Sequence, residues 1–376
     1  MPFDRPSSIT ARLAQPMWLA LAVLMAWFLL ESLIYRSGLY TRYLAEPHSN
    51  AGSTMLRPLL AKRWATQTPP TVLAFGNSIV GQGFSPATAS TVEPKLNFIN
   101  VAVPGSSPRT WFYLLRKIQR DGTPFDAVAV GITYRRESTG RWADWPLDPA
   151  FMVPLTDLRD AFEFPASFES ADSRRAAYNT LWLPALQMQK DTQALLSSPR
   201  QRWNNLQVTK TWWLENIGKY TGRGGTMPVL AFDAQRRVLD WGDATPEQRA
   251  LVEQHLQDLA QTPDPGHDAF LAHWMGKVLE RARANHARLI IYPLPRGPYP
   301  QVLPEENELP HSLAALAHEP DVTVLPPDFL ADLEAPEYFF DTLHGNVAAN
   351  RIFSERVAHA VADAMAGGAS REATPP

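Results

Sequence analysis

The chain has 376 residues, of which 45% are hydrophobic and 19% are charged. This composition excludes a disordered polymer, and the length suffices for one large domain with its own core. A formal charge of −3 gives no electrostatic case for nucleic-acid binding, and the absence of cysteine excludes disulfides, thiolate catalysis and cysteine-ligated metals.

The first predicted element is a hydrophobic helix near the N-terminus. An unbroken apolar run covers residues 17–30, and the segment 16–35 reaches the roughly 20 residues that a helix needs to cross a bilayer. A cleaved signal peptide is the alternative, but no small-x-small cleavage site follows the run. We therefore expect residues 1–15 to be cytoplasmic, residues 16–35 to form a transmembrane anchor, and the remaining chain to lie outside the membrane.

A parallel sheet is predicted after this anchor. Residues 36–68 are polar and mixed, which indicates a membrane-proximal connector, and the pattern then changes to short apolar runs typical of buried strands. A helical pattern at 109–119 separates the second and third runs. Strand, helix, strand in this order favours a parallel sheet with right-handed crossovers. The predicted strands are 71–76, 97–105, 125–133, 288–295 and 321–329.

A large insertion interrupts this alternation of strands and helices. Residues 142–270 are rich in Trp and Pro and show no clean strand alternation, so we interpret them as an insertion or lid within a domain that spans 69–366. A last helix is predicted at 347–365, with Asn346 as its N-cap, followed by a disordered tail at 367–376. Further helices are predicted near 173–195, 245–261 and 268–286.

Three residues indicate acyl-transfer chemistry. Ser78 follows the first strand and Gly76, where a serine is either an exposed nucleophile or the N-cap of the next helix. A serine nucleophile needs a base, and a base needs a carboxylate that orients it and stabilises its cation. Asp341 and His344 lie three residues apart just before the last helix, so one tight loop lets the carboxylate reach the imidazole.

These segments together resemble the SGNH (GDSL-like) hydrolase superfamily. Gly76-Asn77-Ser78 is similar to the Gly-Asp-Ser of its first block, Asn100-Val-Ala-Val-Pro-Gly105 to its second, and Asp341-x-x-His344 to its last. The resemblance covers about residues 71–141 and 283–366. It implies a three-layer α/β/α flavodoxin-like domain with Ser78, Asp341 and His344 as catalytic residues. It also implies that the backbone N–H groups of Ser78 and Gly105 hold the oxyanion.

The third block of the family departs from its usual sequence. The family has Gly-x-Asn, whose Asn donates to the oxyanion, whereas this chain has Gly131-Ile132-Thr133. Asn77 or Thr133 is then the candidate for the additional donor, and each lost donor typically costs about 2.7–4 kcal/mol of transition-state stabilisation. Three alternatives follow: a slow hydrolase, an enzyme whose best acceptor is not water, or an inactive protein.

This departure and the single N-terminal span resemble membrane-anchored SGNH-like proteins of bacterial envelopes, several of which work beside membrane-bound O-acyltransferases. The resemblance implies a serine O-acyltransferase or acylesterase for an envelope or exported polysaccharide, held in the inner membrane with its catalytic domain in the periplasm. A simple carbohydrate or lipid esterase and an inactive scaffold that recruits a membrane acyltransferase remain as alternatives.

Other residues give weaker indications of binding. Arg296 either binds an anionic group or is solvated, and Trp212 and Trp213 are candidates for a sugar-binding groove. The spacing of His267 and His273 is not a recognised metal-ligand spacing, so we expect no metal and no cofactor.

Overall fold

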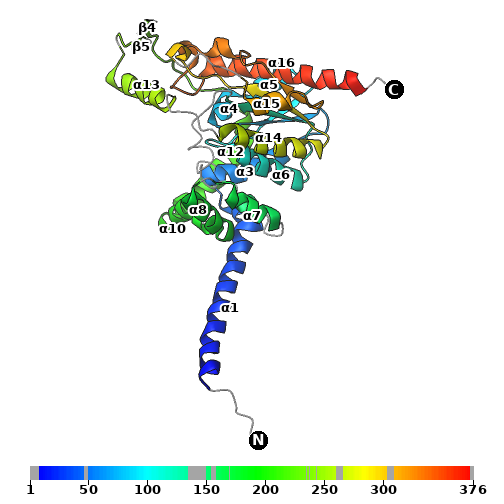
Figure 1. Ribbon diagram of the computed structural model, residues 1–376, viewed down its shortest axis with the longest axis vertical. Helices are drawn as coiled ribbons and strands as arrows, with labels where there is room; N and C mark the ends of the chain where they lie inside the picture. Colours follow the sequence, from blue (N-terminus) through cyan, green and yellow to red (C-terminus); the bar gives the residue numbers. More distant parts are fainter. Residues whose placement is uncertain are drawn as a thin grey trace.

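The protein contains a parallel sheet with helices on both faces and one long helix, α1 (Ser8–Arg36), that projects from one end of the globular part (Figure 1). The α/β architecture predicted from the sequence is confirmed. The segment Pro16–Arg36 of α1 is long and apolar enough to cross a membrane. The computed structural model describes residues 8–45, 50–133, 150–153, 158–168, 170–233, 235–236, 238–242, 244–259, 266–302 and 309–372.

Five strands form the main sheet in the order β2-β1-β3-β6-β7, and every neighbouring pair is parallel. Each lies within a predicted strand but is shorter. The chain places β2 on one side of β1 and then returns to place β3 on the other, so the connectivity changes direction between β1 and β3. Ligands bind beyond the carboxyl ends of strands at such a point. The strands are β1 (Thr71–Phe75), β2 (Asn97–Asn100), β3 (Ala127–Ile132), β6 (Arg288–Pro293) and β7 (Val322–Val324).

Alternating side chains of the strands build two separate cores. Leu73 and Phe75 of β1 belong to one hydrophobic cluster, while Val72 and Ala74 belong to the other. This period of two buries both faces of the sheet and gives three layers, helix on sheet on helix. The first core includes α3 (Asn50–Trp64), α6 (Pro108–Arg120), α14 (His267–Arg283) and α15 (His311–Leu316); the second includes α4 (Ser78–Gly83), α5 (Pro86–Val92) and α16 (Val347–Glu372).

Two segments differ from the sequence prediction. The predicted connector 36–68 instead forms α2 (Leu39–Tyr43) and α3, whose Leu56 and Leu60 are buried in the first core. Helix α3 packs against α6, so its apolar side chains belong to the domain despite the polar composition of the segment. The last helix continues to Glu372, beyond the start of the predicted tail, and residues 373–376 lie outside the described part of the chain.

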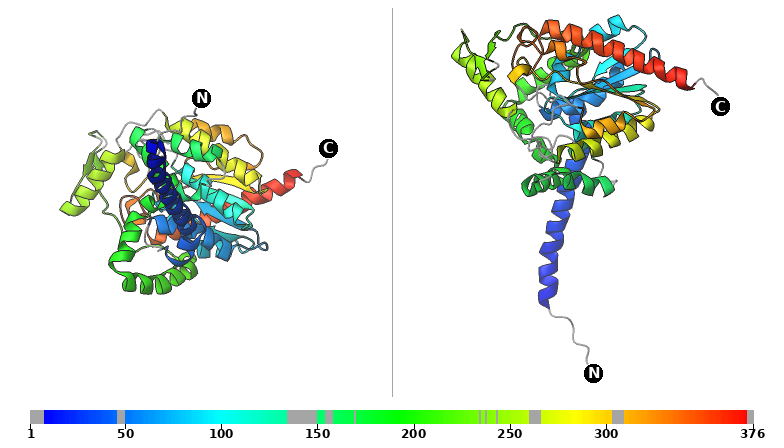
Figure 2. Two further views of the ribbon diagram at one scale, coloured as in Figure 1. Left: turned by 90° about the horizontal axis from the view of Figure 1, so that it is seen from below. Right: turned by 45° about the horizontal axis from the view of Figure 1, so that its top comes forward.

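Within the insertion, the described residues of 158–205 form five helices at the end of the domain from which α1 projects (Figures 1 and 2). We call them the basal helices. Phe164, Leu181 and Met188 place them in the same hydrophobic core as Leu73 of the sheet, so they are an integral layer of the domain. The basal helices are α7 (Leu158–Ala166), α8 (Ala171–Trp182), α9 (Pro184–Gln187), α10 (Gln189–Ser197) and α11 (Pro199–Asn205).

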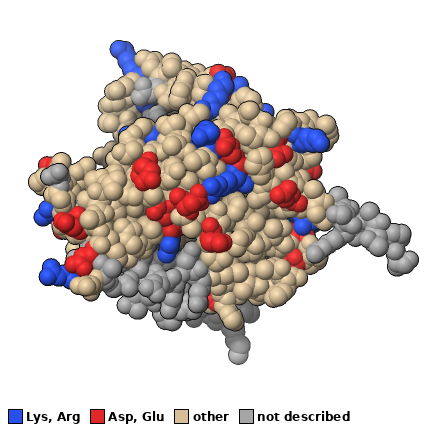
Figure 3. Space-filling view, turned by 90° about the horizontal axis from the view of Figure 1, so that it is seen from above, with Lys and Arg blue, Asp and Glu red and all other residues tan. Residues whose placement is uncertain are grey.

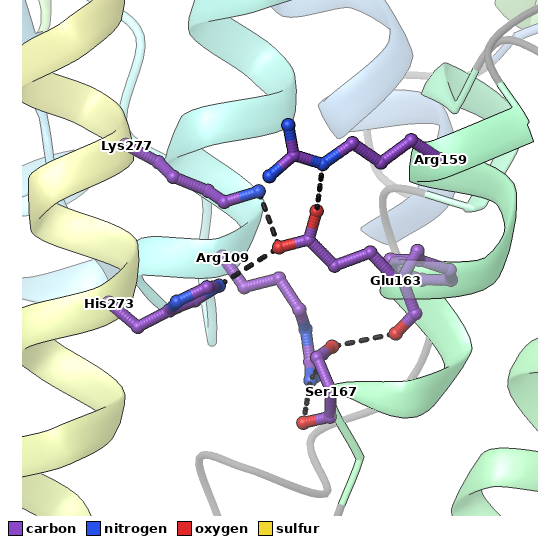
Figure 4. Close-up of polar contacts among 7 residues, drawn as sticks. Arg109, Arg159, Glu163, Ser167, His273 and Lys277 are labelled. Carbon is purple, nitrogen blue, oxygen red and sulfur yellow. Dashed lines mark hydrogen bonds and ion pairs between the residues drawn. The ribbon is translucent and has the colours of Figure 1, made fainter.

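A cluster of charged side chains ties α7 to α14 (Figure 4). Glu163 accepts a hydrogen bond from Lys277 at 2.5 Å, and its other close partner is His273 at 3.1 Å. Partial burial would raise the pKa of Glu163, but the hydrogen bonds and positive charge of Lys277 and His273 outweigh it and hold that pKa below its usual value. Nearby, Arg109 of α6 donates to the hydroxyl of Ser167, which follows α7.

The second half of the insertion includes an antiparallel hairpin that the sequence pattern did not predict. Its strands are only three residues each, too short for a clear alternation. The hairpin and α13 share a small hydrophobic cluster with Phe339, which belongs to the loop before α16. The remaining elements are η2 (Ala150–Met152), η3 (Leu206–Lys210), α12 (Thr211–Asn216), η4 (Ile217–Lys219), β4 (Ala231–Asp233), β5 (Val238–Asp240), α13 (Pro246–Leu259), η5 (Pro300–Val302), η6 (Ala331–Leu333) and η7 (Pro336–Tyr338).

Candidate active site

Ser78 lies at the carboxyl end of β1, where the chain turns directly into α4. The Oδ1 of Asn77 accepts the Ile79 N–H at 2.9 Å and so caps α4, which leaves Ser78 as the first helical residue and not the cap. Gly76 makes this turn possible because a Cβ at this position would collide with the side chain of Val80. The half-buried hydroxyl of Ser78 is therefore held at the strand end by a rigid turn.

The carboxylate of Asp341 organises the loop that carries His344. Its Oδ1 accepts two backbone N–H groups, from Leu343 at 2.8 Å and from His344 at 2.7 Å. Its Oδ2 lies 2.9 Å from Nδ1 of the imidazole. Burial alone would raise the pKa of Asp341, but the hydrogen bonds from His344 and Leu343 outweigh it and lower that pKa, so the group stays ionised at neutral pH.

The three side chains meet although Ser78 and His344 are 266 residues apart. The Oγ of Ser78 lies 2.9 Å from Nε2 of His344. Because an ionised carboxylate only accepts hydrogen bonds, Nδ1 of a neutral imidazole carries the proton and Nε2 accepts from the Ser78 hydroxyl. The imidazole is 17% exposed and Asp341 is 33% exposed, so the group is sheltered but open to a substrate.

The predicted oxyanion donors lie at the same edge of the sheet. The loop that contains Gly105 is held against the β1 turn, since Val103 donates to the Gly76 carbonyl at 3.0 Å and so does the Ser106 hydroxyl at 3.0 Å. The φ of Gly105 is +66°, a conformation that favours glycine. Within the described part of the chain, no group accepts the Gly105 N–H, which is thus free to bind an oxyanion.

The two side-chain donors differ in availability. Thr133 is buried at the end of β3, the strand next to β1, and no hydrogen bond to Ser78 or Gly105 occurs within the described residues. The Oδ1 of Asn77 is occupied as the cap of α4, so only its amide N–H₂ remains to serve as a donor. The backbone N–H groups of Ser78 and Gly105 are therefore the better supported pair.

The predicted binding residues have other roles. Arg296 is mostly buried and is not a freely solvated side chain, because it pairs with buried Glu334 through Nε at 2.9 Å and Nη2 at 2.6 Å. Trp213 is a core residue, with the guanidinium of Arg57 over its ring at 4.9 Å, so the prediction that it lines a sugar groove is wrong. Trp212 is exposed on α12, a helix that packs mainly against η3 and η4.

No model of a known protein family matches this sequence. No curated protein matches it either. The chemistry of the site therefore rests on its geometry. Among the described residues, no group of three or more His, Asp or Glu side chains is arranged to hold a metal ion.

Part of the insertion braces the loop that carries the imidazole, which the sequence did not predict. The Val347 N–H donates to the Arg223 carbonyl at 2.9 Å, and the Asn346 side chain donates to the Gly225 carbonyl at 2.8 Å. Asn346 also caps α16, as predicted, because its Oδ1 accepts the Ala348 N–H at 3.0 Å. The glycine-rich sequence Gly222-Arg-Gly-Gly225 is the feature from which this close approach to the loop before α16 could have been predicted.

Phe340 stacks on the imidazole, and Arg223 lies over the ring of Phe340. The ring of Phe340 lies 5.8 Å from that of His344 at an interplanar angle of 13°, and the guanidinium of Arg223 lies 5.0 Å from the Phe340 ring centroid. The stack restricts rotation of the imidazole and keeps Nε2 directed at Ser78. Phe340 could have been noticed from the aromatic run before Asp341, but its partner Arg223 is distant in sequence.

Proposed function

We propose that this protein is a membrane-anchored serine O-acyltransferase or acylesterase of the SGNH (GDSL-like) superfamily. Its substrate is an envelope or exported polysaccharide, and it acts from the periplasmic side of a bacterial inner membrane through an acyl-serine intermediate. The observation that carries the proposal is the 2.9 Å contact between Ser78 Oγ and His344 Nε2, with Asp341 on the other ring nitrogen.

The first half of the reaction forms the acyl-enzyme. Nε2 of His344 takes the hydroxyl proton as Ser78 Oγ attacks the ester carbonyl carbon, and the N–H groups of Ser78 and Gly105 hold the resulting oxyanion. When the tetrahedral intermediate collapses, the bond to the donor oxygen breaks and the imidazolium returns the proton to that oxygen. Asp341 stabilises the imidazolium and fixes its orientation.

The second half releases the acyl group. A sugar hydroxyl or water gives its proton to Nε2 and attacks the acyl carbon, after which Ser78 Oγ leaves with that proton. Thr133 in place of the family's Asn removes one donor, which slows the reaction with any acceptor unless binding energy compensates. A bound polysaccharide hydroxyl supplies such binding energy and water does not, so any preference for transfer over hydrolysis comes from binding of the acceptor and not from the substitution.

Two features of the fold support the family and the location. The strand order β2-β1-β3-β6-β7 has the connectivity of flavodoxin-like sheets, and Ser78 lies beside the point where that connectivity reverses. The segment Pro16–Arg36 has the length and composition of a membrane span.

A fluorophosphonate probe tests the catalytic claim. We expect the full-length protein to be labelled, Ser78→Ala to be unlabelled, and Ser90→Ala to be labelled like wild type, because the hydroxyl of Ser90 accepts the Phe98 N–H and lies on a different helix. Failure of wild type to react would favour the inactive scaffold. With an acyl donor and a polysaccharide present, acylated polysaccharide supports transfer, whereas free acid alone identifies an esterase.

A further inference from the structure

The upper turns of α1 are built into the basal helices. Tyr35 is 8% exposed and belongs to the core cluster that contains Leu73 of the sheet. The carboxylate of Glu31 accepts the Ala185 N–H at the start of α9 at 2.7 Å. Arg36 donates to the carbonyls of Leu181 and, at 2.8 Å, Val153. The last turns of α1 therefore hold a fixed position relative to the globular domain.

The exposed part of α1 is too short to cross a bilayer alone. Residues 17–30 extend about 21 Å at about 1.5 Å per residue, whereas a hydrocarbon core is about 30 Å thick. Including residues 31–36, of which Glu31 and Tyr35 are buried against the domain, closes this gap. Extending the span in the other direction would place Arg12 in the hydrocarbon, which is costly. Residues 31–36 also include the ionisable Glu31 and Arg36, but both side chains are hydrogen-bonded to backbone groups of the domain. A complete span thus brings the basal helices that contact residues 31–36 to the membrane surface.

Large apolar side chains on these helices are exposed. Trp182 packs beside Phe28 of α1 with ring centroids 6.1 Å apart, and it is still 46% exposed. Phe162 on α7 is 63% exposed, Leu186 on α9 is 47% exposed, and Leu196 on α10 is 75% exposed. We call these four side chains the basal apolar surface. Trp182 joins this surface to α1 through its contact with Phe28, and aromatic residues are enriched where a helix leaves the bilayer.

The charge of this region fits an anionic surface. Residues 158–205, which hold α7 to α11, contain six Lys or Arg and five Asp or Glu, a net charge of +1 in a chain whose total is −3. The positive excess lies in residues 171–205, α8 to α11, with five Lys or Arg and two Asp or Glu. The face opposite α1 instead carries both signs interspersed over its surface (Figure 3). Basic residues beside an apolar surface are attracted to the headgroups of anionic lipids.

We propose that the basal helices rest on the bilayer, with the basal apolar surface in the headgroup region of anionic lipid. This inference rests on the membrane anchor of the proposed function. It adds that the domain is seated at a fixed orientation on the lipid and is not carried at a distance on a flexible stalk. The candidate active site is then held at one constant height above the membrane.

Single cysteines in this cysteine-free chain provide the test. Leu186→Cys and Leu196→Cys carry an environment-sensitive fluorophore on the basal apolar surface. Leu251→Cys on α13 is the matched control, since Leu251 is 51% exposed and α13 lies at the other end of the domain (Figure 1). Leu24→Cys reports the anchor itself. The labelled full-length variants, each with the wild-type unfolding temperature, are reconstituted into vesicles of phosphatidylglycerol and phosphatidylcholine.

Quenching by a lipid with a nitroxide at headgroup depth decides the outcome. We expect loss of fluorescence at positions 186 and 196 and no loss at 251. If the fluorophore at position 24 is shielded from aqueous iodide but those at 186 and 196 are quenched no more than the one at 251, the membrane anchor is supported and the contact of the basal helices with the bilayer is refuted. If 24 is also open to iodide, the anchor fails and the seating fails with it. Shielding of 186 and 196 only when other membrane proteins are present would assign the surface to a protein partner and overturn the proposal.

Discussion

Asp341→Asn should change the tautomer of the His344 imidazole while leaving the fold of the loop that carries it unchanged. Oδ1 of Asp341 accepts the backbone N–H groups of Leu343 and His344, and an asparagine oxygen can accept both in the same way. The new amide N–H₂ then replaces Oδ2, which lies 2.9 Å from Nδ1 in the wild type. Two donors cannot share this contact, so Nδ1 must lose its proton and Nε2 must carry it. Nε2 then no longer accepts from Ser78.

The expected loss is large because the base is unavailable and not merely weakened. The corresponding substitution in a serine-protease triad lowers kcat by about 10⁴-fold, which equals about 5.5 kcal/mol of transition-state stabilisation. We expect a similar fall in the rate of fluorophosphonate labelling. Stability should change little because the two backbone hydrogen bonds remain. Asp341→Ala removes these bonds as well, and should lower both the labelling rate and the unfolding temperature.

The assay compares initial labelling rates of the full-length variants at one pH. Asp332→Asn is the control, since Asp332 is an exposed carboxylate that pairs with Arg356 on the surface. It should react like wild type. Labelling of Asp341→Asn at the rate of this control would show that the carboxylate does not set the tautomer, and the proposed mechanism would be wrong.

Three further predictions concern the surroundings of the site. Gly131→Ala should destabilise the protein by about 1–3 kcal/mol in urea unfolding, because the new Cβ would lie 2.5 Å from Val80 Cγ2. The control is Gly81→Ala in α4, whose Cβ meets no atom within 4 Å and which should stabilise the protein by up to about 1 kcal/mol. Equal effects of the two substitutions would contradict the steric explanation. Phe340→Leu removes the ring stacked on the imidazole, a contact of about 0.5–1.5 kcal/mol, and should slow labelling by about two- to tenfold; an unchanged rate would exclude a positioning role. The pKa of Glu163 is lower in the folded state than in the unfolded state, so this carboxylate stabilises the fold above the unfolded pKa of about 4.3, and the stabilisation is lost as pH falls through the lower folded value. The stability difference between wild type and Glu163→Gln should therefore shrink as pH falls below about 5. A difference that grows on acidification would refute this explanation.

The sequence by itself determined the sheet and the local parts of the site. The five apolar runs are short, rich in β-branched residues and bounded by turn residues, so they specify buried strands without reference to the rest of the chain. Asp341 and His344 are three residues apart, and their mutual contact is made within one loop. Ser78 follows a strand end that the same apolar pattern marks. These features depend on neighbours in sequence, which a pattern can report.

Only the tertiary structure decided which distant groups meet. The 2.9 Å contact of Ser78 with His344, the stack of Arg223 on Phe340, and the pairing of Arg296 with Glu334 each join segments whose separation no periodicity encodes. The same reason explains why residues 36–68 appeared to be a polar connector. The apolar side chains of α3 are buried where the helix packs against α6, and burial by a distant partner is a property of the folded chain and not of local composition.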